Sequence, residues 1–210
     1  MIRLMLVDDH AMLREGLRSK LAGSPDIEVV GEASSAKELM ATIDTLKPSV
    51  MILDLKLPDA NGVTLIRQVK TSLPSCKIVV LTMYDHVRYA VHALGSGADG
   101  FVVKGAPFEE LLQAIRTVTN NNTYISTGMA TKLASHMKRG KRKGSLESLS
   151  QREFEVLILL GNGLSIKEIA HQLGVSEKSV TTYRARVMEK LQMANKSDLI
   201  RYAIESGLIE

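Results

Sequence analysis

The chain has 210 residues, a length that fits one large domain or two small ones. Hydrophobic residues make up 45% and charged residues 24%, which is typical of a globular protein and argues against wholesale disorder. No segment reaches the ~18 consecutive apolar residues that cross a bilayer, and the first residues lack the pattern of a secretory signal. The single cysteine, Cys76, excludes an intramolecular disulfide and a cysteine-rich zinc site and favours a reducing, cytoplasmic location.

The positive charge of the chain is concentrated in its C-terminal part. Residues 1–125 carry 13 Lys and Arg against 14 Asp and Glu, whereas residues 126–210 carry 14 against 9. An excess of this kind favours an anionic partner, such as nucleic acid, for the C-terminal part.

The first 120 residues alternate between short apolar runs and amphipathic segments. The runs are rich in Val, Ile and Leu and predict strands that are buried on both faces. They are Leu4–Val7, Glu28–Val30, Val50–Leu53, Ile78–Leu81 and Phe101–Val103. Helices are expected between them at about 11–22, 35–46, 62–72, 86–96 and 107–119. Five strand–helix pairs in strict alternation predict a doubly wound α/β domain with a parallel sheet.

The C-terminal part has a different pattern. Residues 137–148 contain five basic residues and two glycines, which predicts a flexible linker after a short helix at 128–137. Beyond it the periodicity is helical only. Ser150 with Glu153 and Ser165 with Glu168 fit the capping box and open helices at about 150–161 and 165–173.

Two further helices complete the predicted C-terminal domain. Ser176 fits the N-cap of a helix at about 177–192, and Asn195 fits the start of a helix at about 195–206. The sequence therefore predicts a compact all-α domain of four short helices after the α/β domain.

Polar residues follow the predicted strands at their carboxyl ends. Asp8 and Asp9 follow the first strand, Asp54 the third, Thr82 the fourth and Lys104 the fifth. These ends meet at one edge of a parallel sheet. Any one of these residues could be a helix cap or a solvated strand end, but all five together favour a shared functional site at this edge. Three carboxylates suit Mg²⁺, beside which a carboxylate can attack a phosphoryl group.

Lys104 and Thr82 are placed to stabilise the oxygens of such a phosphoryl group. His10 and Cys76, by contrast, have no suitably spaced partners in the sequence, which favours a surface or packing role over metal binding.

Residues 1–120 resemble the receiver domain of bacterial two-component response regulators, a flavodoxin-like (βα)5 fold. The residues that carry the resemblance are Asp8, Asp9, Asp54, Pro58, Gly62, Thr82, Phe101 and Lys104. Gly105 departs from the pattern, because many receivers have proline after the lysine.

The resemblance implies that Asp54 accepts a phosphoryl group from a sensor histidine kinase. It implies Mg²⁺ as the cofactor, held by Asp9, Asp54 and the backbone carbonyl of Lys56, with Asp8 contributing through water. It further implies that Thr82 and Lys104 contact the phosphate and that Phe101 is the aromatic switch residue.

Residues 165–186 are predicted to form a helix, a glycine turn at Gly174 and a second helix, which is the spacing of a helix-turn-helix. The second helix of this motif enters the major groove of DNA. Its exposed face is expected to present Lys178, Thr181, Thr182, Tyr183, Arg184 and Arg186. Arginines can reach guanine edges or phosphates, while threonines suit phosphate contacts or a thymine methyl group.

Residues 146–210 resemble the LuxR-type DNA-binding domain, which leaves 121–145 as a linker. The matching segments are Leu149–Glu153, Lys167–Ala170, Leu173–Ser176 and Met188–Leu191. Together the two domains resemble the NarL/FixJ branch of response regulators, whose members often have Lys at the position of Thr181. The resemblance implies a transcription regulator, not an enzyme, that binds promoter half-sites as a homodimer once phosphorylated.

Two other functions are open to this sequence. One is a phosphorylation-independent regulator whose receiver mediates only protein contacts. The presence of all three carboxylates, Asp8, Asp9 and Asp54, disfavours this function. The other is an enzyme that uses an aspartyl-phosphate. It is disfavoured because Lys56 stands two positions after Asp54, where a second acidic residue is expected.

Overall fold

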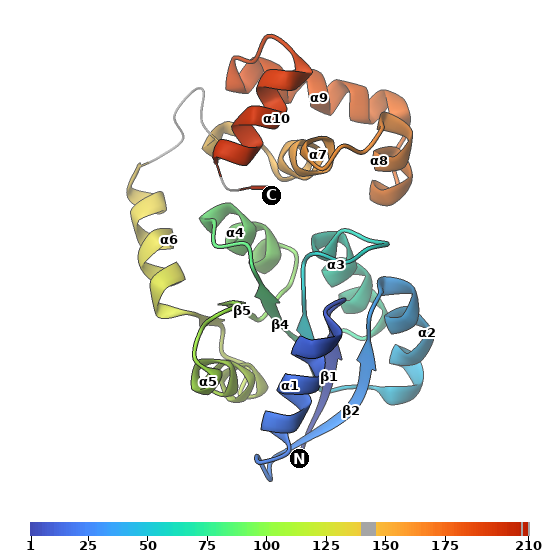
Figure 1. Cartoon of the computed structure of the whole chain (residues 1–210), viewed down its shortest axis with the longest axis vertical. Helices are drawn as coiled ribbons and strands as arrows, with labels where there is room; N and C mark the ends of the chain where they lie inside the picture. Colours follow the sequence, from blue (N-terminus) through green and yellow to red (C-terminus); the bar gives the residue numbers. More distant parts are fainter. Residues whose placement is uncertain (140–145, 207, 210) are drawn as a thin grey trace. The chain divides into compact units, whose positions relative to one another are not determined.

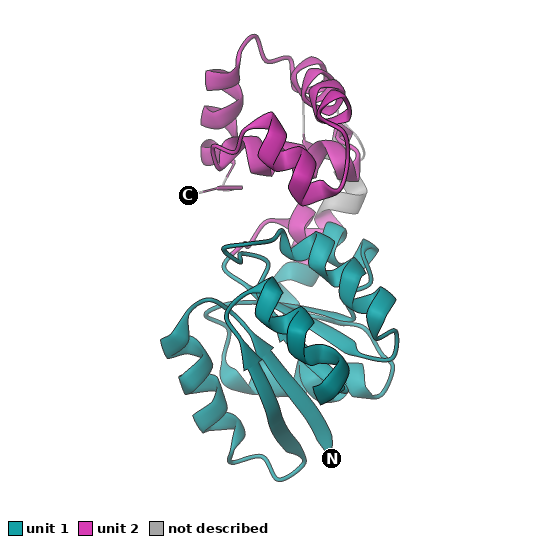
Figure 2. Ribbon diagram, turned by 90° about the vertical axis from the view of Figure 1, so that its right-hand side faces the viewer, with its two compact units in different colours: residues 1–83, 90–130 teal, residues 84–89, 131–210 magenta. Residues whose placement is uncertain are grey.

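The computed structural model describes residues 1–139, 146–206 and 208–209. The chain divides into two compact units, residues 1–83 with 90–130 and residues 84–89 with 131–210 (Figure 2). None of the helices within the described residues combines the length and apolar character that a bilayer-spanning helix needs.

The first unit is built on a parallel six-stranded sheet with the order β2-β1-β3-β4-β5-β6 (Figure 1). Its strands are β1 (Ile2–Val7), β2 (Ile27–Ala33), β3 (Val50–Leu53), β4 (Lys77–Thr82), β5 (Gly100–Val103) and β6 (Tyr124–Ile125). The predicted doubly wound, flavodoxin-like sheet is confirmed. Strand β6 is additional, and its two residues are too few to show a period of two in the sequence.

Five helices connect these strands close to the predicted positions. They are α1 (Ala11–Leu21), α2 (Ala36–Leu46), α3 (Gly62–Ser72), α4 (Val87–Gly95) and α5 (Phe108–Thr119). Leu17 and Leu21 of α1 form one buried cluster with Leu111 and Ile115 of α5 and with every second residue of the strands. The alternate strand residues face the opposite side, so both faces of the sheet are covered.

The loop between β3 and α3 is fixed at several points. The Asp59 carboxylate accepts hydrogen bonds from the backbone N–H groups of Ala36 and Lys37, each at 2.9 Å, at the start of α2. The Asn61 side chain caps α3 by accepting from the N–H groups of Val63 and Thr64. This loop begins at Asp54, so its anchors also fix the position of the candidate phosphoacceptor.

The C-terminal part consists of helices. They are α6 (Thr127–Arg139), a short 3₁₀ turn (Leu146–Ser148), α7 (Gln151–Gly161), α8 (Ile166–Leu173), α9 (Glu177–Leu191) and α10 (Lys196–Glu205). The predicted linker at 137–148 is wrong at both ends, because α6 continues to Arg139 and the 3₁₀ turn occupies 146–148. The turn is anchored by Leu146, which is buried, while residues 140–145 lie outside the described part of the chain.

The predicted helix starts of the C-terminal domain are confirmed. Ser150 with Glu153 and Ser165 with Glu168 form complete capping boxes, in which each serine accepts from the glutamate N–H and each glutamate accepts from the serine N–H. Ser176 and Asn195 cap α9 and α10 with their side chains. These caps satisfy backbone N–H groups that have no partner within a helix.

Replacing Gly62 by Ala is expected to destabilise the first unit by ~1–3 kcal/mol. A Cβ atom at this position would clash with the Leu55 Cα and lie 2.8 Å from the Leu55 carbonyl oxygen, and backbone atoms cannot move aside as a flexible side chain can. Chemical denaturation of the two proteins measures the change. The matched control is Gly16→Ala in α1, where no atom lies within 4 Å and a gain of ~0.5–1 kcal/mol is expected. Equal stability of Gly62→Ala and the parent chain would contradict the close packing.

Replacing Glu153 by Gln is expected to cost ~1–3 kcal/mol at neutral pH, because the buried carboxylate loses the charge with which it pairs with the half-exposed Lys190. Burial opposes the charge on Glu153, but the Lys190 ammonium at 2.7 Å and the hydrogen bonds with Ser150 outweigh it and hold the pKa of Glu153 below its ordinary value. A lowered folded-state pKa stabilises the fold above the unfolded pKa of ~4.3, and this stability is lost as the pH falls through the folded pKa. The difference between variant and parent should therefore shrink below about pH 4.

Amide hydrogen exchange of α7 measures this effect locally. Glu168→Gln is the matched control, because Glu168 occupies the same position in the other capping box but is exposed and, among the described residues, has only Ser165 as a partner. A loss that is the same for both variants, or that persists at low pH, would show that the ion pair with Lys190 contributes nothing.

Candidate functional site

Backbone pairing places the strand-end residues at one edge of the sheet. The Asp54 N–H donates to the Val7 carbonyl at 2.9 Å, so Asp54 continues the pairing of β3 with β1 and lies beside Asp8. The Lys104 N–H donates to the Thr82 carbonyl at 2.8 Å and continues the pairing of β5 with β4 in the same way. The strand order reverses between β1 and β3, the position at which open parallel sheets form their sites.

One ammonium group is shared by two buried carboxylates at this edge. Lys104 Nζ lies 2.6 Å from Asp54 Oδ2 and 2.7 Å from Asp8 Oδ2, and these side chains are only 8%, 2% and 6% exposed, respectively. Burial alone would lower the pKa of Lys104, but its hydrogen bonds and ion pairs with Asp54 and Asp8 outweigh that effect and raise the pKa above its ordinary value. The lysine is therefore a fixed positive charge at the centre of the site.

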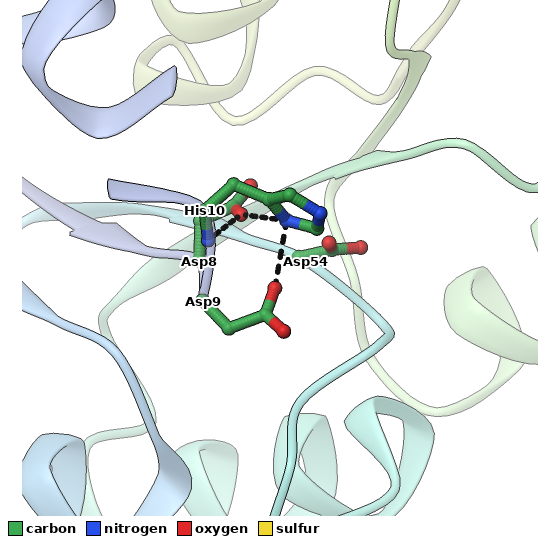
Figure 3. A group of neighbouring side chains, drawn as sticks. All are labelled: Asp8, Asp9, His10 and Asp54. Carbon is green, nitrogen blue, oxygen red and sulfur yellow. Dashed lines mark hydrogen bonds and ion pairs between the residues drawn. The ribbon is translucent and has the colours of Figure 1, made fainter. Parts of the chain in front are cut away.

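Asp9 and His10 complete a cluster beside this ion triad (Figure 3). His10 Nδ1 lies 2.7 Å from Asp9 Oδ1 and 3.0 Å from Asp8 Oδ1. One ligand atom from each of Asp8, Asp9, His10 and Asp54 can be chosen so that all four lie within 4.8 Å of one another. The sequence favoured a surface or packing role for His10, but its imidazole contacts these carboxylates. Its position directly after Asp8 and Asp9 is the feature of the sequence that could have indicated this contact.

The other predicted site residues have different surroundings. Lys56 donates its N–H to Asp54 Oδ1 at 3.2 Å, so its backbone lies next to the Asp54 carboxylate while its side chain is exposed. Thr82 is the last residue of β4 and is 1% exposed, and Phe101 on β5 is completely buried. Arg14 was not predicted. Its guanidinium donates to the Asp8 carbonyl oxygen and lies 3.4 Å from Glu32, which ties α1 to the end of β1.

The donor set of this cluster is chemically suited to a hard divalent cation. Receiver domains bind Mg²⁺ at an acidic pocket, and the present cluster provides three carboxylates close together. Two of them, Asp8 and Asp54, are buried, and buried carboxylates require a counter-charge. Lys104 supplies one positive charge for the two, so the site retains a negative charge that a cation can neutralise.

The second candidate site is the outward face of α9. Helix α9 packs against α7 and α8, with Val180, Val187 and Leu191 buried. Gly174 ends α8 in the left-handed conformation with φ 63°, which makes the turn between α8 and α9. The predicted helix–glycine turn–helix order is present.

The predicted DNA-contacting residues differ in exposure. Lys178, Thr181, Thr182 and Arg186 are exposed. Tyr183 and Arg184 are half-buried, because they follow Val180 by three and four residues and so lie closer to its buried side of the helix. The exposed face also carries Ala185, which the sequence analysis did not single out.

Comparison with known proteins covers both units. Residues 4–116 match the response regulator receiver domain, and residues 147–203 match the bacterial regulatory proteins of the luxR family. The oxygen regulatory protein NreC of Staphylococcus haemolyticus (strain JCSC1435) is 35% identical over 216 aligned positions, which cover all of both chains.

Solved structures of RcsB are also similar. RcsB from Salmonella enterica serovar Typhimurium, bound to promoter rprA in the presence of phosphomimetic BeF3-, has 27% identity and a TM-score of 0.80, covering 96% of this chain and 97% of that one. A structure of two RcsB dimers bound to two parallel DNAs has 28% identity and a TM-score of 0.64, covering 98% of each chain.

Replacing Lys104 by Met is expected to destabilise the first unit by ~3–5 kcal/mol, because Asp8 and Asp54 stay buried and lose their shared counter-charge. The raised pKa of Lys104 means that its contribution is complete below the ordinary lysine pKa of ~10.4 and is lost only as the pH rises through the raised value. Chemical denaturation without divalent cations should therefore give the same loss at about pH 7 and about pH 9.

Arg116→Met is the control for this measurement. Arg116 pairs with Asp26 at 2.9 Å in the same unit, but the two side chains are 51% and 43% exposed, and an ion pair in contact with solvent contributes little. If the two variants lost equal stability, the buried triad would have no special role in the fold.

Proposed function

Because the chain belongs to the response regulators that join a receiver domain to a LuxR-type domain, we propose that phosphorylation of Asp54 by a sensor histidine kinase controls sequence-specific DNA binding and transcription. The buried Asp8–Lys104–Asp54 triad is the observation that supports this proposal most directly. We assign residues 1–120 to the phosphoacceptor domain and 146–210 to the DNA-binding domain, with 121–145 as the connection between them, although this connection includes β6 of the sheet and most of α6. The chain is a transcription regulator and not an enzyme.

The phosphoryl transfer uses the chain's own groups as follows. An oxygen of Asp54 attacks the phosphorus of a phosphohistidine, the P–N bond breaks, and the imidazole of the kinase leaves. Lys104, which contacts Asp54 Oδ2, is placed to neutralise the charge of the phosphoryl oxygens, and Thr82 at the end of β4 is placed to bind one of them. Phosphorylation adds a charge of about −1.5 to −2 at Asp54.

Mg²⁺ is the proposed cofactor of this step. Asp9, Asp54 and the backbone carbonyl of Lys56 would hold it, and Asp8 would contribute through water. When bound, the cation offsets negative charge on the transferring oxygens. His10 also faces Asp8 and Asp9, so a cation that enters the cluster meets an imidazole as well as carboxylates.

The signal is proposed to leave the site through Thr82 and Phe101. Both side chains are buried and lie on the neighbouring strands β4 and β5, so a displacement of Thr82 toward the phosphate changes the packing of Phe101. Receivers changed in this way pair as a homodimer, and the two α9 helices then occupy promoter half-sites about one DNA turn apart. We place the protein in the cytoplasm, where both the kinase and the DNA are available.

Phosphodonor-dependent DNA binding tests this function. With Mg²⁺ and a small phosphodonor, the affinity for a selected promoter duplex should rise by about 5–150-fold, which is the usual range of coupling between two sites. Asp54→Asn should abolish the increase, because an amide cannot accept the phosphoryl group. Asp44→Asn is the matched control, since Asp44 is an exposed aspartate of α2 in the same unit.

Analytical ultracentrifugation of the same samples separates the possible outcomes. A monomer-to-dimer shift that needs Asp54 supports both the phosphorylation and the homodimer. Full DNA binding by Asp54→Asn without a phosphodonor effect would contradict the proposal. It would favour the alternative of a phosphorylation-independent regulator whose receiver mediates only protein contacts.

A further inference from the structure

The outward face of α9 has a small apolar centre, and the margins of this face carry two cations, Lys178 and Arg186, and two exposed carboxylates, Glu177 and Glu189. Thr181, Thr182 and Ala185 are exposed, and Ala185 lies four residues after Thr181 and three after Thr182, so it neighbours both of them on the helix surface. Lys178 lies one turn before this group, and Arg186 directly follows Ala185 in the sequence; both are exposed. The centre of the face is therefore built from short side chains, while the charges lie at its margins.

The two threonine hydroxyl groups are turned back toward the helix. Thr181 Oγ1 donates to the Glu177 carbonyl at 2.9 Å, and Thr182 Oγ1 donates to the Lys178 carbonyl at 3.0 Å. A hydroxyl has one proton to donate. A phosphate oxygen can only accept, so neither threonine can donate to a phosphate while these bonds are made.

What the two threonines offer to DNA is therefore mainly their methyl groups. Ala185 adds a third methyl group, since it lies four residues after Thr181 and three after Thr182. In the major groove, the C5-methyl group of thymine is the base substituent that makes apolar contacts with such side chains. The flanking Lys178 and Arg186 match the charge of the phosphate backbone.

We infer that Thr181, Thr182 and Ala185 form a methyl patch that recognises thymine C5-methyl groups in the half-site, while Lys178 and Arg186 hold the neighbouring phosphates. This inference rests on the proposed function and adds the chemical class of base that α9 selects. The sequence left two roles open for the threonines, a phosphate contact and a thymine contact. The methyl patch assigns the thymine contact to them.

Uracil substitution tests the patch directly, because uracil differs from thymine only by the missing C5-methyl group. The full-length protein, with Mg²⁺ and a small phosphodonor, first selects a duplex from a random-sequence library. Each thymine of the half-site is then replaced by uracil, and the affinity is measured by fluorescence anisotropy. At one or more positions the affinity should fall about fourfold, the fold-change that corresponds to ~0.8 kcal/mol for one buried methyl group.

Two pairs of variants identify the responsible atoms. Thr181→Ser and Thr182→Ser keep the hydroxyl group and remove the methyl group. At least one of them should lose about fourfold in affinity for the thymine duplex and no longer distinguish uracil at one position. Thr181→Val and Thr182→Val keep the methyl group and remove the hydroxyl, so they should bind within about twofold of the parent chain and still discriminate against uracil.

Thr71→Ser is the matched control. Thr71 is an exposed threonine of α3 whose hydroxyl also donates to the carbonyl four residues earlier, that of Arg67 at 2.8 Å. This substitution should leave both the affinity and the uracil response unchanged. A change of the same size as in α9 would show that the serine variants act through general helix stability.

Three outcomes would overturn the inference. The first is a half-site in which no thymine responds to uracil. The second is unchanged affinity and uracil discrimination in both serine variants. The third is loss of affinity in the valine variants only, which would assign the recognition to the hydroxyl groups. Failure to select any duplex is a different result, because it would overturn the proposed DNA binding itself.

Discussion

The first unit depends on one electrostatic constraint, that two buried carboxylates share a single ammonium group. Asp8 and Asp54 can lie this close only because Lys104 stands 2.7 and 2.6 Å from them. The three residues come from the ends of β1, β3 and β5, so the triad forms only when strands far apart in the sequence are correctly paired. The fold thus assembles a charged site that no single segment of the chain could stabilise.

The C-terminal helices are specified in a different way, by contacts that are local in the sequence. Ser150, Ser165, Ser176 and Asn195 each cap the helix that directly follows them. Glu153 then joins α7 to α9 through Lys190, which converts one local cap into a tertiary contact. Such caps can be recognised within a few residues, which explains why all four helix starts were predicted from the sequence.

What the sequence did not reveal required three-dimensional information. Strand ends gave Asp8, Asp9, Asp54, Thr82 and Lys104, because parallel strands bring their carboxyl ends to one edge. The contacts of His10 and Arg14 depend on side-chain direction at the end of β1, which no periodicity encodes. Strand β6 has two residues that pair with β5, which is too short a segment to show a period of two. Helix α6 ends at Arg139, two residues after its predicted end, in a basic segment without apolar periodicity. The half-burial of Tyr183 and Arg184 could have been found from their spacing to Val180.

In the proposed interface of α9, some residues attract any DNA and others select a base, and the hydrogen bonds of the polar groups decide which do which. A positive excess in the C-terminal residues supplies affinity for DNA that does not depend on sequence and falls with added salt. Related regulators often have a lysine where this chain has Thr181. The Thr181 hydroxyl donates its proton to the Glu177 carbonyl of the same helix. In the proposed interface, the chain has a methyl group that distinguishes one base from another where a lysine charge would strengthen binding to any duplex. We therefore propose that an apolar contact sets the selectivity at this position, while Lys178 and Arg186 contribute attraction to the phosphates of any duplex.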